Sequence, residues 1–166
     1  MPTNGGTAGP ASLRAHGMSR PDLRLQRTTL LVADLERSLR LYRDVLGFEV
    51  AFSKESAADS YSYDVFTIPR GSPIRFCVLG LPEQPGCLGL TEVEGLEPAA
   101  ERPRRSGLVI HVPDLDAALS GADALGLHRY AEDRLLTHDG REGREVGVVD
   151  ADGNLVVLYH IGRAAP

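Results

Sequence analysis

Residues 23–48 read LRLQRTTLLVADLERSLRLYRDVLGF and predict a strand, a helix and the start of a second strand. Apolar and β-branched residues over 23–33 favour the strand. Asp34 stands at the N-cap position of a helix whose apolar residues recur at helical spacing, and Gly47 ends that helix in the C′ position. This local pattern therefore predicts a strand-helix-strand unit.

The same unit returns about eighty residues later. The sequence motif Val-x-Asp-Leu occurs at residues 32–35 and again at residues 112–115. Asp114 caps a second helical stripe, which ends at Gly126. Strand-like runs follow each helix, at residues 48–53, 61–69, 73–81 and 87–93 in the first half and at 127–131, 145–149 and 155–161 in the second. Residues 150–154 form the turn before the last strand.

The pattern divides the chain into two modules. The first 22 residues mix Gly, Pro, Ser, Thr and Ala without periodicity, which is typical of a flexible tail. Prolines and arginines mark a polar linker in the middle of the chain. We expect a tail at 1–22, a first module at 23–96, a linker at 97–106, a second module at 107–161 and a C-terminal tail at 162–166.

Composition excludes several classes of protein. The 166 residues are 42% hydrophobic, enough for a globular core, and carry a net charge of −5 with both signs interspersed, which argues against nucleic acid as a partner. Cys77 and Cys87 lie in apolar, strand-like segments of the sequence, as reduced thiols of a protein core do. No secretory or transmembrane run is visible, so we expect a cytoplasmic protein that does not contact a membrane.

Val-x-Asp-Leu-Glu-x-Ser-Leu-x-x-Tyr-x-x-Val-Leu-Gly-Phe, at residues 32–48, resembles the vicinal oxygen chelate superfamily, which includes glyoxalase I, extradiol dioxygenases and bleomycin resistance proteins. Asp150-x-Asp-Gly-Asn and the Leu-Val-Val-Leu-Tyr that follows resemble the closing turn and strand of that superfamily. The resemblance implies an α+β, glyoxalase-like fold in which two tandem βαβββ modules form a cup-shaped mixed sheet. It also implies a small-molecule ligand or substrate, frequently a homodimer, and often a divalent metal in the cup.

The metal positions implied by the resemblance carry unsuitable residues. The ligand of the first strand lies seven residues before the capping Asp, which here is Arg27, a permanent cation without a lone pair. The equivalent position of the second module is Gly107, and the closing carboxylate position is Val157. The fourth position lies on one of two later strands of the first module, one of which carries Glu92. We therefore expect no metal in the usual place and no cofactor.

Strand alternation predicts which side chains face the cup. It also leaves His160 on the opposite face from His111, so these two histidines should not converge on a displaced metal. The resulting lining is an apolar pocket with a few polar groups, suited to a hydrophobic ligand with an anionic or hydrogen-bonding group for Arg27. Arg27 could equally reach solvent or a surface carboxylate. The expected lining comprises Arg27, Thr29, Leu31, Val109, His111, Leu155, Val157 and Tyr159.

Two of these residues are candidates for catalysis. A buried, cup-facing His111 could transfer protons near neutral pH, or it could be a core histidine bonded to backbone. Tyr159 could orient a ligand through its hydroxyl, or it could pack with its tip in water. No nucleophile motif accompanies them, so catalysis has no visible covalent carrier.

Three functional hypotheses follow. The first is a binding protein that resembles bleomycin resistance proteins and sequesters an apolar or aromatic metabolite or antibiotic. The alternative is a metal-independent isomerase, cyclase or lyase that uses His111 as acid or base. The third is a metal-dependent glyoxalase-type lyase or dioxygenase. A fold alone does not choose among them, because function depends on the site.

Overall fold

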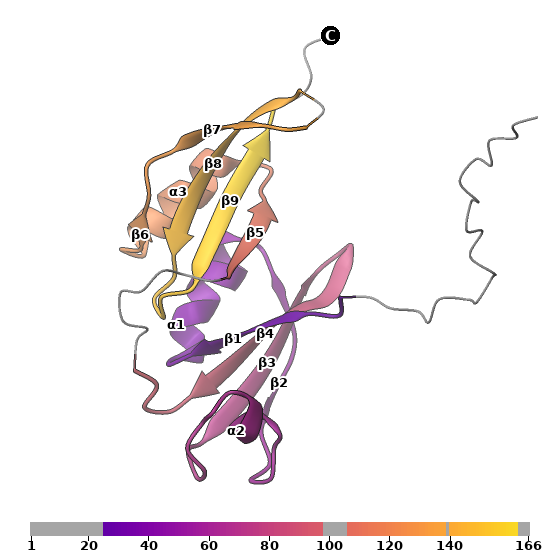
Figure 1. Cartoon of the computed structure of the whole chain (residues 1–166), viewed down its shortest axis with the longest axis vertical. Helices are drawn as coiled ribbons and strands as arrows, with labels where there is room; N and C mark the ends of the chain where they lie inside the picture. The colour runs from indigo at the N-terminus through magenta and orange to yellow at the C-terminus, as the bar shows by residue number, and fades with distance from the viewer. Residues whose placement is uncertain (1–24, 98–105, 139, 163–166) are drawn as a thin grey trace, which may run out of the picture.

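The computed structural model describes residues 25–97, 106–138 and 140–162, whose strands form two sheets (Figure 1). The first sheet has the order β1-β4-β3-β2, and the second has the order β5-β9-β8-β6 with β7 also paired to β8. The strands of the first sheet are β1 (Thr28–Val32), β2 (Glu49–Glu55), β3 (Ile74–Leu81) and β4 (Gln84–Val93). Those of the second are β5 (Gly107–His111), β6 (His128–Arg129), β7 (Asp133–Leu136), β8 (Glu142–Val149) and β9 (Leu155–Ile161).

Each module repeats one topology. Its first strand runs parallel to its last, β1 with β4 and β5 with β9, and the remaining pairs are antiparallel. The α+β class and the glyoxalase-like fold are thus confirmed. The strands form two sheets, however, since no ladder joins β1 to β5 in the part of the chain that the structure describes. The predicted N-terminal tail and nearly all of the predicted linker and C-terminal tail lie outside the described residues.

Both predicted helix starts are confirmed. Asp34 Oδ1 accepts a hydrogen bond from the backbone N–H of Arg37 at 2.9 Å, and Asp114 Oδ1 accepts one from Ala117 at 2.9 Å. The helices are α1 (Leu35–Leu39), which continues as the π-helical turn η1 (Arg40–Val45), and α3 (Leu115–Ala124). Gly47, which follows η1, has a positive φ of 78°, the left-handed conformation that glycine adopts without strain.

The strand predicted at 61–69 is wrong, because this segment contains a short helix, α2 (Ser62–Val65). Tyr61 and Val65 are exposed and only Tyr63 between them is buried, so the alternation of apolar residues in the sequence does not reflect alternating burial. Tyr63 and Ile68 instead cover one end of the first sheet, where they form a small cluster with Ile74 and Val93. The sequence reading also missed β7.

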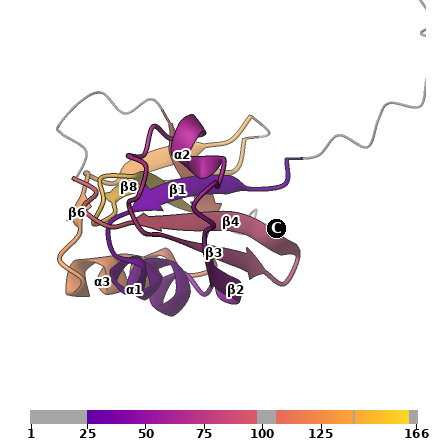
Figure 2. The same ribbon diagram turned by 90° about the horizontal axis from the view of Figure 1, so that it is seen from below.

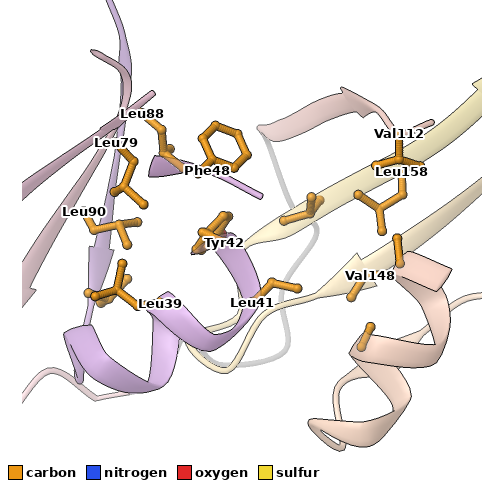
Figure 3. Packing of buried hydrophobic residues seen from close by; sticks show 14 of the residues in the cluster. Leu39, Leu41, Tyr42, Phe48, Leu79, Leu88, Leu90, Val112, Val148 and Leu158 are labelled. Carbon is orange, nitrogen blue, oxygen red and sulfur yellow. The ribbon is translucent and has the colours of Figure 1, made fainter. Parts of the chain in front are cut away.

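One main core joins the two modules. α1 and α3 lie on the same side of the molecule, and α2 lies on the opposite side (Figure 2). Tyr42 and Phe48 from the first module share a buried cluster with Val148 and Leu158 from the second (Figure 3). No helix among the described residues is long and apolar enough to span a membrane.

The closing turn at residues 150–154 connects the modules as well as the strands β8 and β9. Asp152 Oδ1 accepts hydrogen bonds from the backbone N–H of Ala33 at 2.9 Å and from Arg37 Nη2 at 2.8 Å. Ser38 Oγ donates to the other carboxylate oxygen at 3.2 Å. This turn of the second module therefore fixes the start of α1 in the first.

Candidate functional site

A groove of about 650 Å³ is lined by residues from β5, from the segment that leads into β1 and from the turn between β3 and β4. Figure 1 shows where these strands lie in the two sheets. Both modules contribute to it. The residues that line it are Leu25, Gln26, Arg27, Thr28, Phe48, Leu81, Gln84, Pro85, Cys87, Leu88, Gly107, Leu108, Val109, Ile110, His111 and Tyr159.

The deep wall of the groove is apolar. Phe48 and Leu88 belong to the buried main core, and Leu108 and Ile110 pack against that core from β5. Such a wall gains free energy by covering the apolar part of a ligand, at about 25 cal/mol per Å² removed from water. It offers no hydrogen bonds from side chains, so orientation must come from the polar residues around it.

Arg27 supplies the positive charge of the groove. Its guanidinium lies over the ring of Phe76, with Cζ 5.6 Å from the ring centroid. None of the ion pairs found within the described residues includes Arg27. Its planar donors therefore remain open to an anionic group.

His111 and Tyr159 lie together at the second-module side of the groove, with ring centroids 5.3 Å apart in an edge-to-face arrangement. The His160 ring stacks on the His111 ring with the centroids 5.8 Å apart, so the prediction that strand alternation separates these two side chains is wrong. The reason lies at the strand end: β5 stops at His111, and Nδ1 of His160 bonds to the carbonyl oxygen of Val112 at 2.9 Å. The alternation of side chains along a strand does not predict the position of the His160 ring, because this ring extends past the end of β5.

Four of the predicted lining residues meet at the groove, and four do not. Arg27, Val109, His111 and Tyr159 line it. Thr29, Leu31, Leu155 and Val157 lie outside it.

Local packing explains those four positions. Leu31 packs against the small cluster around Tyr63. Leu155 stands beside Gly107, and Val157 pairs with Val109 on the sheet. Thr29 lies over Gly89, next to the stem of Arg27.

Sequence reasoning missed several residues of the site. Cys87 lines the groove as a free, partly buried thiol, and the parallel register of β1 and β4 sets it beside Arg27. Phe48 and Leu88 also line the groove and were not predicted to do so. These residues could be found only from the register between neighbouring strands and from the placement of one module against the other. The sequence of one strand shows neither.

A family model described as the Glyoxalase/Bleomycin resistance protein/Dioxygenase superfamily matches residues 24–158. The chain belongs to this superfamily. Among curated proteins, none matches the chain.

Solved structures of the superfamily share the fold. A glyoxalase family protein from Bacillus cereus is 12% identical over 87% of this chain and 99% of its own, with a TM-score of 0.66. The trypanothione-dependent glyoxalase I of Leishmania major is 22% identical over 83% and 86%, with a TM-score of 0.58. The fosfomycin resistance protein FosX of Listeria monocytogenes, solved with Mn(II) and sulfate, is 16% identical over 82% and 91%, with a TM-score of 0.54.

The structure locates the residues at the positions that the resemblance implies for a metal. Arg27 and Gly107 line the groove, and neither side chain offers a lone pair. Glu92 accepts from the backbone N–H of Leu35 at 2.7 Å and from Arg75 Nε at 2.8 Å, so both of its oxygens are engaged at the start of α1. Within the described ranges, no group of three or more His, Cys, Asp or Glu side chains is placed to hold a metal.

Proposed function

We propose that the chain binds a small apolar or aromatic molecule with an anionic group in the groove between its modules, without a metal in the superfamily's usual position. The groove of about 650 Å³, which combines an apolar wall with Arg27, carries this proposal. Its size is within the range of sites for small organic ligands. Sequestration of a metabolite or antibiotic, as in bleomycin resistance, is the corresponding role.

The chemistry of Arg27 supports an anion at this end of the ligand. A guanidinium can form two parallel hydrogen bonds with a carboxylate, sulfonate or phosphonate. Hydrogen bonds to charged groups contribute about 1.5–3 kcal/mol, which corresponds to roughly tenfold to a hundredfold in affinity. The apolar body would cover Phe48 and Ile110.

Two fluorescent probes with the same aromatic skeleton test the proposal. Anilinonaphthalene sulfonate is anionic, and N-phenylnaphthylamine is its neutral counterpart. We expect both to bind, and the substitution Arg27→Gln to weaken the sulfonate about tenfold while changing the affinity of the neutral probe less than twofold. Arg40→Gln, which removes a charge from the exposed surface of η1, is the matched control. Equal losses in both Gln variants would contradict the proposal.

A second candidate function is metal-independent catalysis, and the position of His111 favours it. The imidazole lines the groove and contacts the ring of Tyr159, so a bound ligand could meet a proton carrier and a hydroxyl at one end. Catalysis predicts a turnover that collapses in His111→Ala, whereas binding alone predicts a ligand affinity within a few-fold of the wild type.

We also propose a homodimer in the cytoplasm. Leu136 is 63% exposed and Val65 is 50% exposed, and both are large apolar side chains outside the groove that a second copy could cover. Free Cys77 and Cys87 support a reducing compartment. Light scattering coupled to size-exclusion chromatography should give twice the chain mass of 17.9 kDa. A monomer at micromolar concentration would refute the dimer.

A further inference from the structure

A row of side chains crosses the open face of the first sheet and ends at Arg27. The Phe52 ring meets the Phe76 ring edge-to-face with centroids 6.2 Å apart, and the guanidinium of Arg27 lies over Phe76. These residues come from β2, β3 and the segment that leads into β1. The row therefore links an outer strand of the sheet to Arg27, the one residue of the row that also lines the groove.

Gly89 leaves the space that this row needs. An ideal Cβ at this position would lie 2.9 Å from Thr29 Oγ1, 3.1 Å from Phe76 Cε2 and 3.5 Å from Arg27 Cδ. The first two distances are shorter than normal van der Waals contacts. The absence of a side chain on β4 thus lets the Phe76 ring and the stem of Arg27 settle side by side over the strand.

We propose that Phe76, seated over Gly89 and braced by Phe52, is a positioning residue that holds the guanidinium of Arg27 at the groove and so makes the groove select anionic ligands. This inference rests on the proposed function. It adds a structural reason for the preference for anionic ligands, namely that Phe76 positions the side chain of Arg27.

The physical reason is preorganisation. A free arginine side chain loses part of its rotamer entropy when it binds a ligand. The contact with Phe76 restricts the side chain before the ligand arrives, because a cation over an aromatic ring is attracted to the negative face of the ring. The N–H groups of Arg27 stay available to a ligand, because none of the ion pairs found among the residues that the structure describes includes this side chain.

The test compares the sulfonate and neutral naphthylamine probes in variants of the row. In Phe76→Leu we expect the preference for the sulfonate to fall about threefold, with the neutral probe within twofold of the wild type. Phe76→Tyr keeps the aromatic face and should retain the preference. Gly89→Ala should also lower the preference, because its Cβ would crowd both Thr29 Oγ1 and the Phe76 ring, which must then shift.

A spectroscopic readout separates positioning from general loss of structure. The Nε–Hε resonance of Arg27 in nuclear magnetic resonance spectra should show a ring-current shift in the wild type and in Phe76→Tyr. That shift should vanish in Phe76→Leu. Arg40→Gln, away from the row, should leave both the shift and the probe preference unchanged.

The outcomes distinguish the two proposals. If Arg27→Gln removes the preference but Phe76→Leu keeps it, the positioning role is overturned and the proposed function stands. If neither probe binds the wild-type chain, or if Arg27→Gln keeps the preference, both are overturned. A lowered preference in Phe76→Leu with rescue by Phe76→Tyr supports the positioning role.

Discussion

The hydroxyl of Tyr42 donates a hydrogen bond to Asp150 Oδ2 at 2.8 Å and thereby ties the helix η1 of the first module to the closing turn of the second. Burial raises the pKa of Tyr42 well above its usual value, and the neighbouring Asp150 adds to the rise, so the phenol stays protonated. The other oxygen of Asp150 accepts from the backbone N–H groups of Asp152 and Asn154 at 3.0 and 2.8 Å. One buried carboxylate therefore shapes the turn and joins the modules.

Loss of the phenol should destabilise the chain. Tyr42→Phe removes a hydrogen bond to a buried carboxylate, and such bonds contribute about 1.5–3 kcal/mol to the free energy of unfolding. Urea denaturation of the wild type and the variant measures this difference. A loss below about 0.5 kcal/mol would show that the bond does not stabilise the joint between the modules.

Loss of the buried carboxylate of Asp152 should lower the stability of the fold more than loss of an exposed ion pair does. Asp152→Ala leaves the backbone N–H of Ala33 without its partner, and we expect a cost of about 1–3 kcal/mol for this unpaired group. The hydroxyl of Ser38 keeps its hydrogen bond to the carbonyl oxygen of Asp34. Arg70→Gln breaks an exposed pair with Asp64 and should cost less than about 1 kcal/mol. If both variants lose the same stability, the turn has no special role.

Helix α3 should reject a side chain at Gly121. Alanine usually stabilises a helix interior by about 1 kcal/mol relative to glycine. Here an ideal Cβ would lie 2.7 Å from Cγ1 of Val45, so Gly121→Ala should instead destabilise by about 1–3 kcal/mol. The double variant with Val45→Ala should recover part of the loss. A more stable single variant would mean that η1 and α3 are not in close contact.

Arg144 should contribute to stability only above the acidic range. It lowers the pKa of Asp116 and of Glu132 through hydrogen bonds to their carboxylates. A carboxyl whose pKa is depressed by folding stabilises the folded state above its unfolded pKa and loses that contribution as the pH falls through the folded pKa. The urea midpoints of wild type and Arg144→Gln should therefore differ at neutral pH and converge under acid. A gap that is constant with pH would contradict this assignment.

The sequence predicted the features that depend on neighbours along the chain. Asp34 and Asp114 cap their helices, and Gly47 ends η1, because caps and stops need only a few adjacent residues. The segment at 61–69 was misread because Tyr61, Tyr63 and Val65 occur at every second residue, as in a strand, although Tyr61 and Val65 are exposed. Local spacing cannot show which of several apolar residues will be covered by a distant strand.

The site was predicted less completely for the same reason. The alternation of side chains along the strands predicted Arg27, His111 and Tyr159 as site residues, and all three line the groove. Phe48 and Cys87 enter it through the placement of one module against the other and through strand register, which no single segment encodes. The sequence does not show the role of Gly89, because this role depends on the positions of Phe76 and Arg27 in the fold.

Mapping the sulfonate probe by amide chemical shifts tests the central claim most directly. On titration of the labelled chain, we predict saturable shifts concentrated at residues 25–28, 87–88 and 107–111, the strand segments that line the groove. The same shifts should be largely lost in Arg27→Gln at equal probe concentration. Shifts confined to α2 and β2, or unchanged in Arg27→Gln, would contradict a groove that binds anionic apolar molecules through Arg27.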